Sequence, residues 1–176
     1  MHTPAPVRDT PRPGLVRAAW RSGAFAALGS TLAAAALSRH FTRHAASTTN
    51  ATSHWLWDRA AFRVHRVTLR HTVAGYLIHH ASSVFWALFF EAWRQRAPRR
   101  AATKAATVAV TAALVDYRVV PRRLTPGFEA HLPRGAVALV YAAFALGLLA
   151  GSRRRGTRTH RRAAAAPRAP QRRRAP

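Results

Sequence analysis

Two adjacent histidines, His79 and His80, lie in the middle of an uncharged apolar stretch bounded by Arg70 and Glu91. At a rise of about 1.5 Å per residue, both imidazoles fall near the centre of the helix that this stretch predicts. A histidine at such a position could titrate a proton or bind a ligand. The alternative is a neutral imidazole that hydrogen-bonds a nearby hydroxyl or carbonyl group, and the sequence leaves both interpretations open.

A polar seam is predicted on the same helix, where hydroxyl and ring groups could hydrogen-bond neighbouring helices. Its members are Tyr76, His79, His80 and Ser83. Adjacent helical residues point about 100° apart and cannot chelate one ion, and the other apolar stretches contain no histidine that could complete a haem site. We therefore expect no metal and no cofactor.

A second group of chemically capable residues, Asp116, Glu129 and His131, lies between two later apolar stretches. These residues could form a hydrolytic or metal site on the far face of a membrane. No motif spacing supports that interpretation, and ordinary ion pairing with the many arginines is the alternative. We therefore expect no catalytic residues and no enzymatic activity. Thr125 before Pro126 nearby predicts the start of a short interfacial helix that ends at Pro133.

Four apolar stretches must position these residues. A charge at mid-bilayer costs about 2.5 to 3.5 kcal/mol, so segments kept free of charge around their whole circumference indicate membrane spans. The sequence predicts an all-α, four-helix transmembrane bundle. The predicted spans cover residues 22–38, 71–91, 101–120 and 135–151.

Length and composition limit what else the chain can contain. Its 176 residues leave no room for a second domain beside four spans of about 20 residues each. Cysteine is absent, which excludes disulfides and thiolate chemistry. The preference for arginine, alanine and proline suits a bacterial protein. Residues 1–14 are expected to form a disordered leader, and the Arg-rich residues 152–176 a disordered tail.

An amphipathic helix lying in the membrane interface is predicted for residues 53–69. Four arginines fall in a narrow sector of its helical wheel, where they could contact lipid phosphates. Tryptophans in the same segment would insert at head-group depth. A solvated helix packed on the bundle is the alternative. The four basic residues are Arg59, Arg63, Arg66 and Arg70.

Small residues recur at every fourth position in the first and fourth predicted spans. The first stripe runs from Ser22 through Ser30 to Ser38, and the second includes Gly147 and Gly151. Such stripes let helices approach closely, so the two spans are expected to pair. An Ala-rich segment without a specific packing face is the alternative for the first stripe. The first span could also be a cleaved signal peptide.

Charge predicts the orientation and the partners. Arginines at the amino end, in the second loop and in the carboxyl-terminal tail place both termini in the cytoplasm, with the tail supplying most of the bias. The expected location is the bacterial inner membrane, and the expected partners are the lipid bilayer and its anionic head groups. A homo-oligomer is compatible with the sequence. The net charge of +24 attracts nucleic acid without specificity, and no recognition fold is evident.

Several elements of the chain resemble one family. His79 and His80 precede the sequence FWALFFEAW, which ends near Glu91, and LTPGFEAHLP precedes the fourth span. From about Ser53 to Gly151 the chain resembles the YagU-like group of uncharacterised bacterial inner-membrane proteins. The resemblance implies a multi-pass inner-membrane protein without an assigned reaction, and it supplies no catalytic residue.

Three classes of function remain after this reasoning. The favoured class is a non-enzymatic integral membrane protein with a structural, accessory or permeation-related role. A membrane enzyme that uses the far-face acid and histidine groups is the second. An Arg-rich nucleic-acid-binding protein is the third, and it leaves the apolar stretches unexplained.

Overall fold

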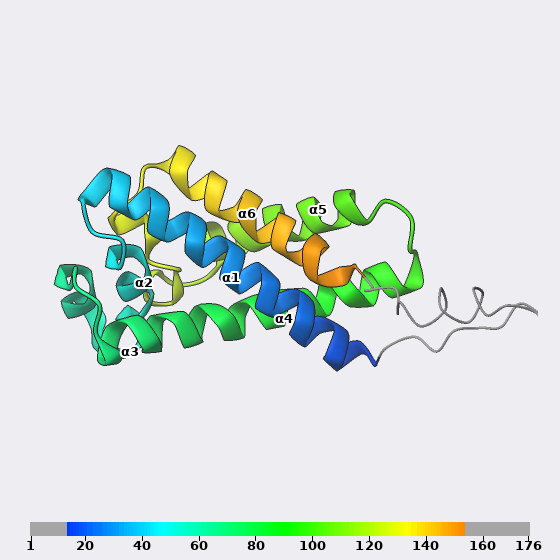
Figure 1. Ribbon diagram of the computed structural model, residues 1–176, viewed down its shortest axis with the longest axis horizontal. Coiled ribbons are helices and arrows are strands. Elements are labelled where there is room, and N and C mark those ends of the chain that lie inside the picture. The colour runs from blue at the N-terminus through cyan, green and yellow to red at the C-terminus, as the bar shows by residue number, and fades with distance from the viewer. Residues whose placement is uncertain (1–13, 154–176) are drawn as a thin grey trace, which may run out of the picture.

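The computed structural model describes residues 14–153, and every regular element in that range is helical (Figure 1). Four long helices run alternately in opposite directions and lie side by side. They are α1 (Leu15–Thr42), α4 (Ala74–Arg96), α5 (Ala101–Leu114) and α6 (Arg134–Ser152). This arrangement confirms the predicted all-α class. The predicted leader and tail lie outside the described residues, apart from Gly14, Ser152 and Arg153.

Short elements gather at one end of the bundle, opposite the loop that joins α4 to α5 (Figure 1). We call residues 43–73 and 115–133 the cap. The cap contains α2 (Ser47–Thr52), α3 (His54–Trp57), the 3-10 helices η1 (Asp58–Arg63), η4 (Arg122–Leu124) and η5 (Phe128–Ala130), and the π-helical turns η2 (Leu69–Val73) and η3 (Val115–Val119). Because η5 contacts both α2 and α6, the two parts of the cap form one unit.

The prediction of one interfacial helix over residues 53–69 is wrong. Asp58 ends α3 with a φ of 47°, a left-handed conformation that interrupts a helix. A 3-10 helix follows, and the backbone is extended at Val64 and Thr68. The arginines predicted to line one helical sector therefore do not share a helical face. They lie instead on a 3-10 helix, an extended segment and a π-helical turn: Arg59, Arg63, Arg66 and Arg70.

The helix boundaries also differ from the predicted spans. Helix α1 extends beyond its predicted span at both ends and includes Arg17, Arg21 and Arg39. Helix α5 stops at Leu114, and the chain then makes the π-helical turn η3. Two described segments, Leu69–Arg96 and Arg134–Ser152, are long and apolar enough to cross a membrane. Core helices of soluble proteins can share that property. The two segments are therefore candidate membrane spans.

The predicted pairing of the two small-residue stripes is confirmed. Every member of the first stripe is buried in α1, and α1 makes its most extensive contact with α6. A Cβ atom added to Gly147 would lie 2.5 Å from the Cα atom of Ala26, and one added to Gly151 would lie 2.7 Å from the Cα atom of Ser22. Only glycine permits this close approach of the two backbones.

The short helix predicted between Thr125 and Pro133 is a single 3-10 turn, η5. Gly127 precedes the turn with a φ of 81°, and its Cα lies against the carbonyl group of Ala51 in α2. Thr125 does not cap the turn through its backbone, but its hydroxyl donates a hydrogen bond of 2.7 Å to the Glu129 carboxylate. The loop is therefore shaped by contact with α2 rather than by a proline-initiated helix.

Candidate functional site

His79 projects from α4 into the interior of the bundle. Its Nε2 atom lies 2.7 Å from the Oγ atom of Ser30 in α1, and its ring packs edge-on against Phe128 of the cap. Ser30 also donates to the carbonyl oxygen of Ala26 at 2.7 Å. Since a hydroxyl has one proton, the arrangement that satisfies both contacts has the His79 Nε2–H donating to Ser30. His79 therefore links α4, α1 and the cap.

His80 faces a different neighbour. Its ring packs edge-on against Trp20 of α1 and tilts against Tyr76, and its Nδ1 atom is buried without a hydrogen-bond partner. Ser83 is buried on the His79 side, where its hydroxyl donates to the His79 carbonyl oxygen at 2.8 Å. The predicted seam is thus divided. His79 and Ser83 line a cavity, whereas Tyr76 and His80 pack beside Trp20.

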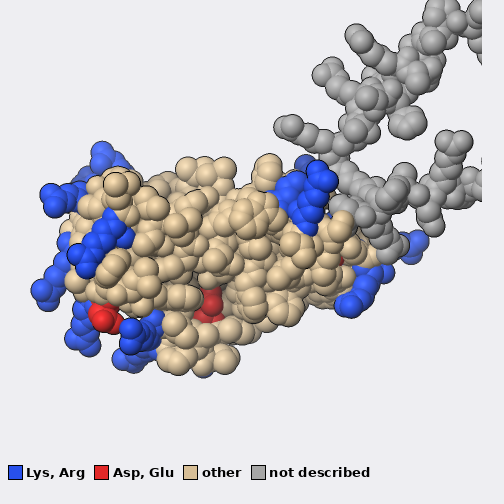
Figure 2. Space-filling model, turned by 90° about the horizontal axis from the view of Figure 1, so that it is seen from below, with Lys and Arg blue, Asp and Glu red and all other residues tan. Residues whose placement is uncertain are grey.

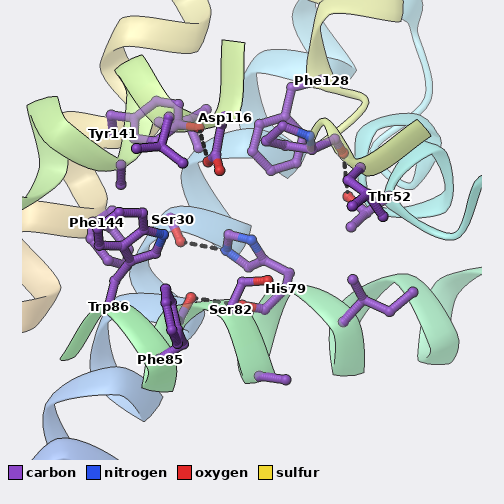
Figure 3. A pocket seen from close by; sticks show the side chains of 18 of the residues that line it. Ser30, Thr52, His79, Ser82, Phe85, Trp86, Asp116, Phe128, Tyr141 and Phe144 are labelled. Carbon is purple, nitrogen blue, oxygen red and sulfur yellow. Dashed lines mark hydrogen bonds between the residues drawn. The ribbon is translucent and has the colours of Figure 1, made fainter. Parts of the chain in front are cut away.

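The central cavity has a volume of about 440 Å³ and lies between α1, α4, α6 and the cap. Figure 3 shows His79, Phe85 and Trp86 on the α4 side and Asp116, Tyr141 and Phe128 facing them across it. Most of the wall is apolar or aromatic. The polar groups in the wall are Ser30, Thr52, His79, Ser82, Ser83, Asp116 and Tyr141.

Two paired polar sites lie on opposite walls of the cavity. Besides the Ser30–His79 pair, Tyr141 donates a hydrogen bond of 2.6 Å to the Oδ2 atom of Asp116 (Figure 3). A carboxylate has further lone pairs, so Asp116 can accept another hydrogen bond from a ligand. The cavity can therefore hold an apolar body and bind one or two polar groups.

The predicted far-face cluster is brought together only in part: Asp116 and Glu129 are electrostatic neighbours, and His131 makes its ring contact elsewhere. Asp116 lines the cavity, Glu129 bonds to Thr125, and His131 packs against His65 at a ring distance of 5.6 Å. Burial lowers the pKa of His131, and the neighbouring His65 lowers it further. Within residues 14–153, no three histidine, cysteine or acidic side chains are placed to hold a metal ion.

A second, open cavity lies on the cap. We call it the basic groove. It has a volume of about 650 Å³ and is lined by His44, Arg63, Val64, His65, Arg66, Thr68, Arg70 and His71. Three of the four arginines predicted to contact lipid phosphates line this groove, and Arg59 does not. Tertiary folding brings them together although the predicted helix is absent.

Asn50 was missed in the sequence and organises the cap. Its side chain is fully buried, and its Nδ2 atom donates to the carbonyl oxygens of Val64 and Arg66 at 2.8 and 2.9 Å. Its Oδ1 atom accepts from Thr72 at 2.6 Å. The available signal was the run Ser47–Ser53, which is polar and uncharged between two apolar stretches.

Glu91 was also missed as a packing residue. It is fully buried near the opposite end of the bundle, where Ser22 donates to one carboxylate oxygen. Arg94 binds the other oxygen at 2.5 and 2.9 Å. Lys104 of α5 is buried beside the same end and donates to the carbonyl oxygens of Ala97 and Arg99. These bonds tie the α4–α5 loop to the helices without forming a cavity.

No protein-family model, curated protein or solved structure matches this chain. The resemblance to the YagU-like group therefore stays a prediction.

Proposed function

We propose that this chain is a multi-pass integral membrane protein of the bacterial inner membrane that binds an amphiphilic small molecule in its central cavity. Its role would be accessory or permeation-related, without catalysis. The observation that carries the proposal is the cavity itself. Its volume of about 440 Å³ falls within the range of about 300 to 1,000 Å³ for ligand sites, which are mostly apolar with few polar groups.

The distribution of large side chains supports a membrane location. Six large apolar residues on the outside of the bundle are between 53% and 66% exposed, whereas the α1–α6 contact is built from serine, alanine and glycine. A soluble bundle instead buries its largest apolar side chains. The six exposed residues are Leu28, Leu32, Leu77, Phe89, Leu139 and Leu146.

The distribution of charge agrees with a spanning orientation. In Figure 2, lysine and arginine gather at the two ends of the bundle, and the face between them is almost free of charge. The 19 residues of α6 rise about 28 Å, close to the hydrocarbon thickness of about 30 Å. Helices α1, α4 and α6 would then cross the bilayer, whereas the 14 residues of α5 rise about 21 Å and would cross together with the π-helical turn η3 that continues them.

The walls of the cavity suggest the chemistry of the ligand. Phe85, Trp86 and Phe144 offer aromatic contact to an acyl or isoprenoid chain. The His79 pair on the α4 wall and the Asp116 pair on the facing wall can each hydrogen-bond a hydroxyl, carbonyl or carboxyl group. An amphiphile with an apolar chain and one small polar head matches this mixture of aromatic and polar groups. Because the cavity would lie at bilayer depth, such a ligand could enter from the lipid.

Trp86 in the cavity wall provides the test. Dibrominated stearic acid quenches tryptophan fluorescence on contact, and we expect saturable quenching of the purified, detergent-solubilised protein. Trp55 and Trp86 both line the cavity, so Trp86→Phe should remove part of the saturable component and the double variant Trp55→Phe/Trp86→Phe most of it. Trp20→Phe is the matched control, because Trp20 is 61% exposed on α1 and lines no part of the cavity.

A cavity-filling variant provides the second arm. Ser82→Phe should abolish saturable quenching, whereas Ala142→Phe, on the exposed face of α6, should leave it unchanged. Linear quenching in the parent, or an equal loss in both variants, would contradict a specific site. Release from the membrane pellet by high salt alone would contradict the membrane location and favour an electrostatic, nucleic-acid-binding role.

A further inference from the structure

The basic groove on the cap is lined by basic residues without an acidic one. Six of its eight lining residues are arginine or histidine, and none is acidic. In the described part of the chain, the one ion pair joins Arg94 to Glu91 near the opposite end of the bundle. Arg63 and Arg66 are exposed and have no carboxylate partner among the described residues. The lining of the groove therefore carries a net positive charge.

The backbone of the groove is held in place from beneath. Asn50 donates to the carbonyl oxygens of Val64 and Arg66, and the Thr68 backbone N–H donates to the Thr72 hydroxyl at 2.9 Å. Thr72 in turn donates to Asn50. This buried network anchors the extended segment that carries the basic side chains. Less ordering is then required when an anion binds.

The residues beside the groove are apolar and exposed. Val67 is 78% and Leu69 is 86% exposed, and both flank Thr68 in the groove wall. The guanidinium group of Arg70 lies 4.1 Å from the ring centroid of Trp57. Basic groups next to exposed apolar and aromatic side chains are typical of surfaces at lipid head-group depth. A free phosphate ion would gain nothing from the apolar neighbours.

We propose that the basic groove binds the phosphate group of an anionic phospholipid, with Val67 and Leu69 inserted among the adjoining acyl chains. Guanidinium groups suit a phosphate because they donate in a fork to two of its oxygens. The placement of the groove at head-group depth rests on the proposed membrane orientation. The binding chemistry itself does not depend on the central cavity.

The test uses the full chain in detergent and dioctanoyl phosphatidylglycerol as the probe, with binding measured by calorimetry. We expect tighter binding than to dioctanoyl phosphatidylcholine or inorganic phosphate. The double variant Arg63→Gln/Arg66→Gln should bind about 25-fold more weakly, since each basic residue near an anionic lipid surface contributes roughly five-fold. Arg63→Lys/Arg66→Lys should bind more tightly than the glutamine variant, because the positive charges remain. It should bind more weakly than the parent protein, because lysine cannot donate in a fork to two phosphate oxygens.

Arg122→Gln/Arg123→Gln is the matched control, because it removes the same charge from exposed cap residues that do not line the groove. It should weaken binding only slightly. An equal loss in both double variants would overturn the proposal in favour of general charge attraction. If inorganic phosphate binds as tightly as phosphatidylglycerol, the ligand of the groove is a free phosphate and not a phospholipid.

Ser82→Phe separates this proposal from the proposed function. That variant should lose stearate quenching and retain phosphatidylglycerol binding. If the parent protein binds phosphatidylglycerol but shows no saturable stearate quenching, the proposal for the groove stands and the proposal for the central cavity is refuted. Circular dichroism and thermal melting will check that the arginine variants are folded, as expected for the replacement of exposed side chains.

Discussion

At the scale of single residues, the polar groups inside this bundle are mostly paired. His79 bonds to Ser30, Asp116 bonds to Tyr141, and Glu91 bonds to Ser22 and Arg94. Each pair joins two helices or closes one turn. In a membrane such pairs are expected, because hydrocarbon offers no alternative partner. The pairing favours a packed interior with a specific cavity over an open aqueous channel.

His79→Leu should leave the fold intact and lower its stability in detergent by about 1 kcal/mol, as for other interhelical hydrogen bonds. Ser30→Ala should show a similar cost. The double variant should cost less than the sum of the two, since both substitutions remove one bond. Thermal melting in detergent measures all three. His80→Leu is the control, because the Nδ1 atom of His80 has no partner. A larger loss for His80→Leu than for His79→Leu would assign the interhelical bond to the wrong histidine.

At the scale of elements, the contact between α1 and α6 determines how the bundle is assembled. Serines and alanines of α1 face glycines of α6, and the two backbones approach closely. Dispersion contacts are strongest at such distances, which compensates for the small size of the side chains. Helices α4 and α6, by contrast, contact each other little. The central cavity lies between them and is lined on one side by the π-helical turn η3.

Gly147→Ala should destabilise the protein. Its new Cβ atom would lie 2.5 Å from the Cα atom of Ala26, so the helices must separate. We expect an overpacking cost of about 1 to 3 kcal/mol, against a gain in helix propensity of about 1 kcal/mol. Gly29→Ala is the control, because its Cβ would meet Ala143 at 3.5 Å, an ordinary contact. Thermal melting should show a loss for Gly147→Ala and no loss for Gly29→Ala. Equal melting temperatures would mean that α1 and α6 are not this close.

At the scale of the whole molecule, the two ends of the bundle are chemically different. One end holds the cap, with the basic groove. The other holds the amino end of α1, the α4–α5 loop and the carboxyl end of α6 (Figure 1). In the orientation predicted from the charges of the sequence, the first end would face the periplasm and the second the cytoplasm. The groove would then contact the outer leaflet of the inner membrane.

Cysteine labelling tests this orientation, because the chain contains no cysteine of its own. Ala45→Cys lies in the exposed loop after α1, and Ala97→Cys lies in the exposed loop after α4. A membrane-impermeant maleimide added to spheroplasts should label the first variant and not the second, because the loops that follow α1 and α4 lie at opposite ends of the bundle (Figure 1). Detergent should expose both sites equally. The reverse pattern would invert the topology, and labelling of both sites in intact spheroplasts would refute a spanning bundle.

Much of the fold could be predicted from local patterns. The apolar stretches correctly indicated four long helices, although α1 is longer and α5 shorter than expected. The four-residue stripes correctly indicated the contact between α1 and α6. The central position of His79 on α4 indicated a buried polar site, but its partner Ser30 lies 49 residues away, and no pattern in the sequence identified it.

The sequence by itself determined the helices and their close-packing faces, because those features repeat within one or two turns of a single segment. Only the tertiary structure decided the cap. There, Asn50 bonds to carbonyl groups 14 and 16 residues away, and Thr52 and Trp55 bond to backbone carbonyl groups of Pro126 and Thr125. These long-range bonds replaced the predicted interfacial helix over residues 53–69 with short turns. A buried amide must be hydrogen-bonded, and the partners of Asn50 lie far along the chain. These bonds hold the segment that contains Val64 and Arg66 in a non-helical conformation, and this segment forms part of the groove.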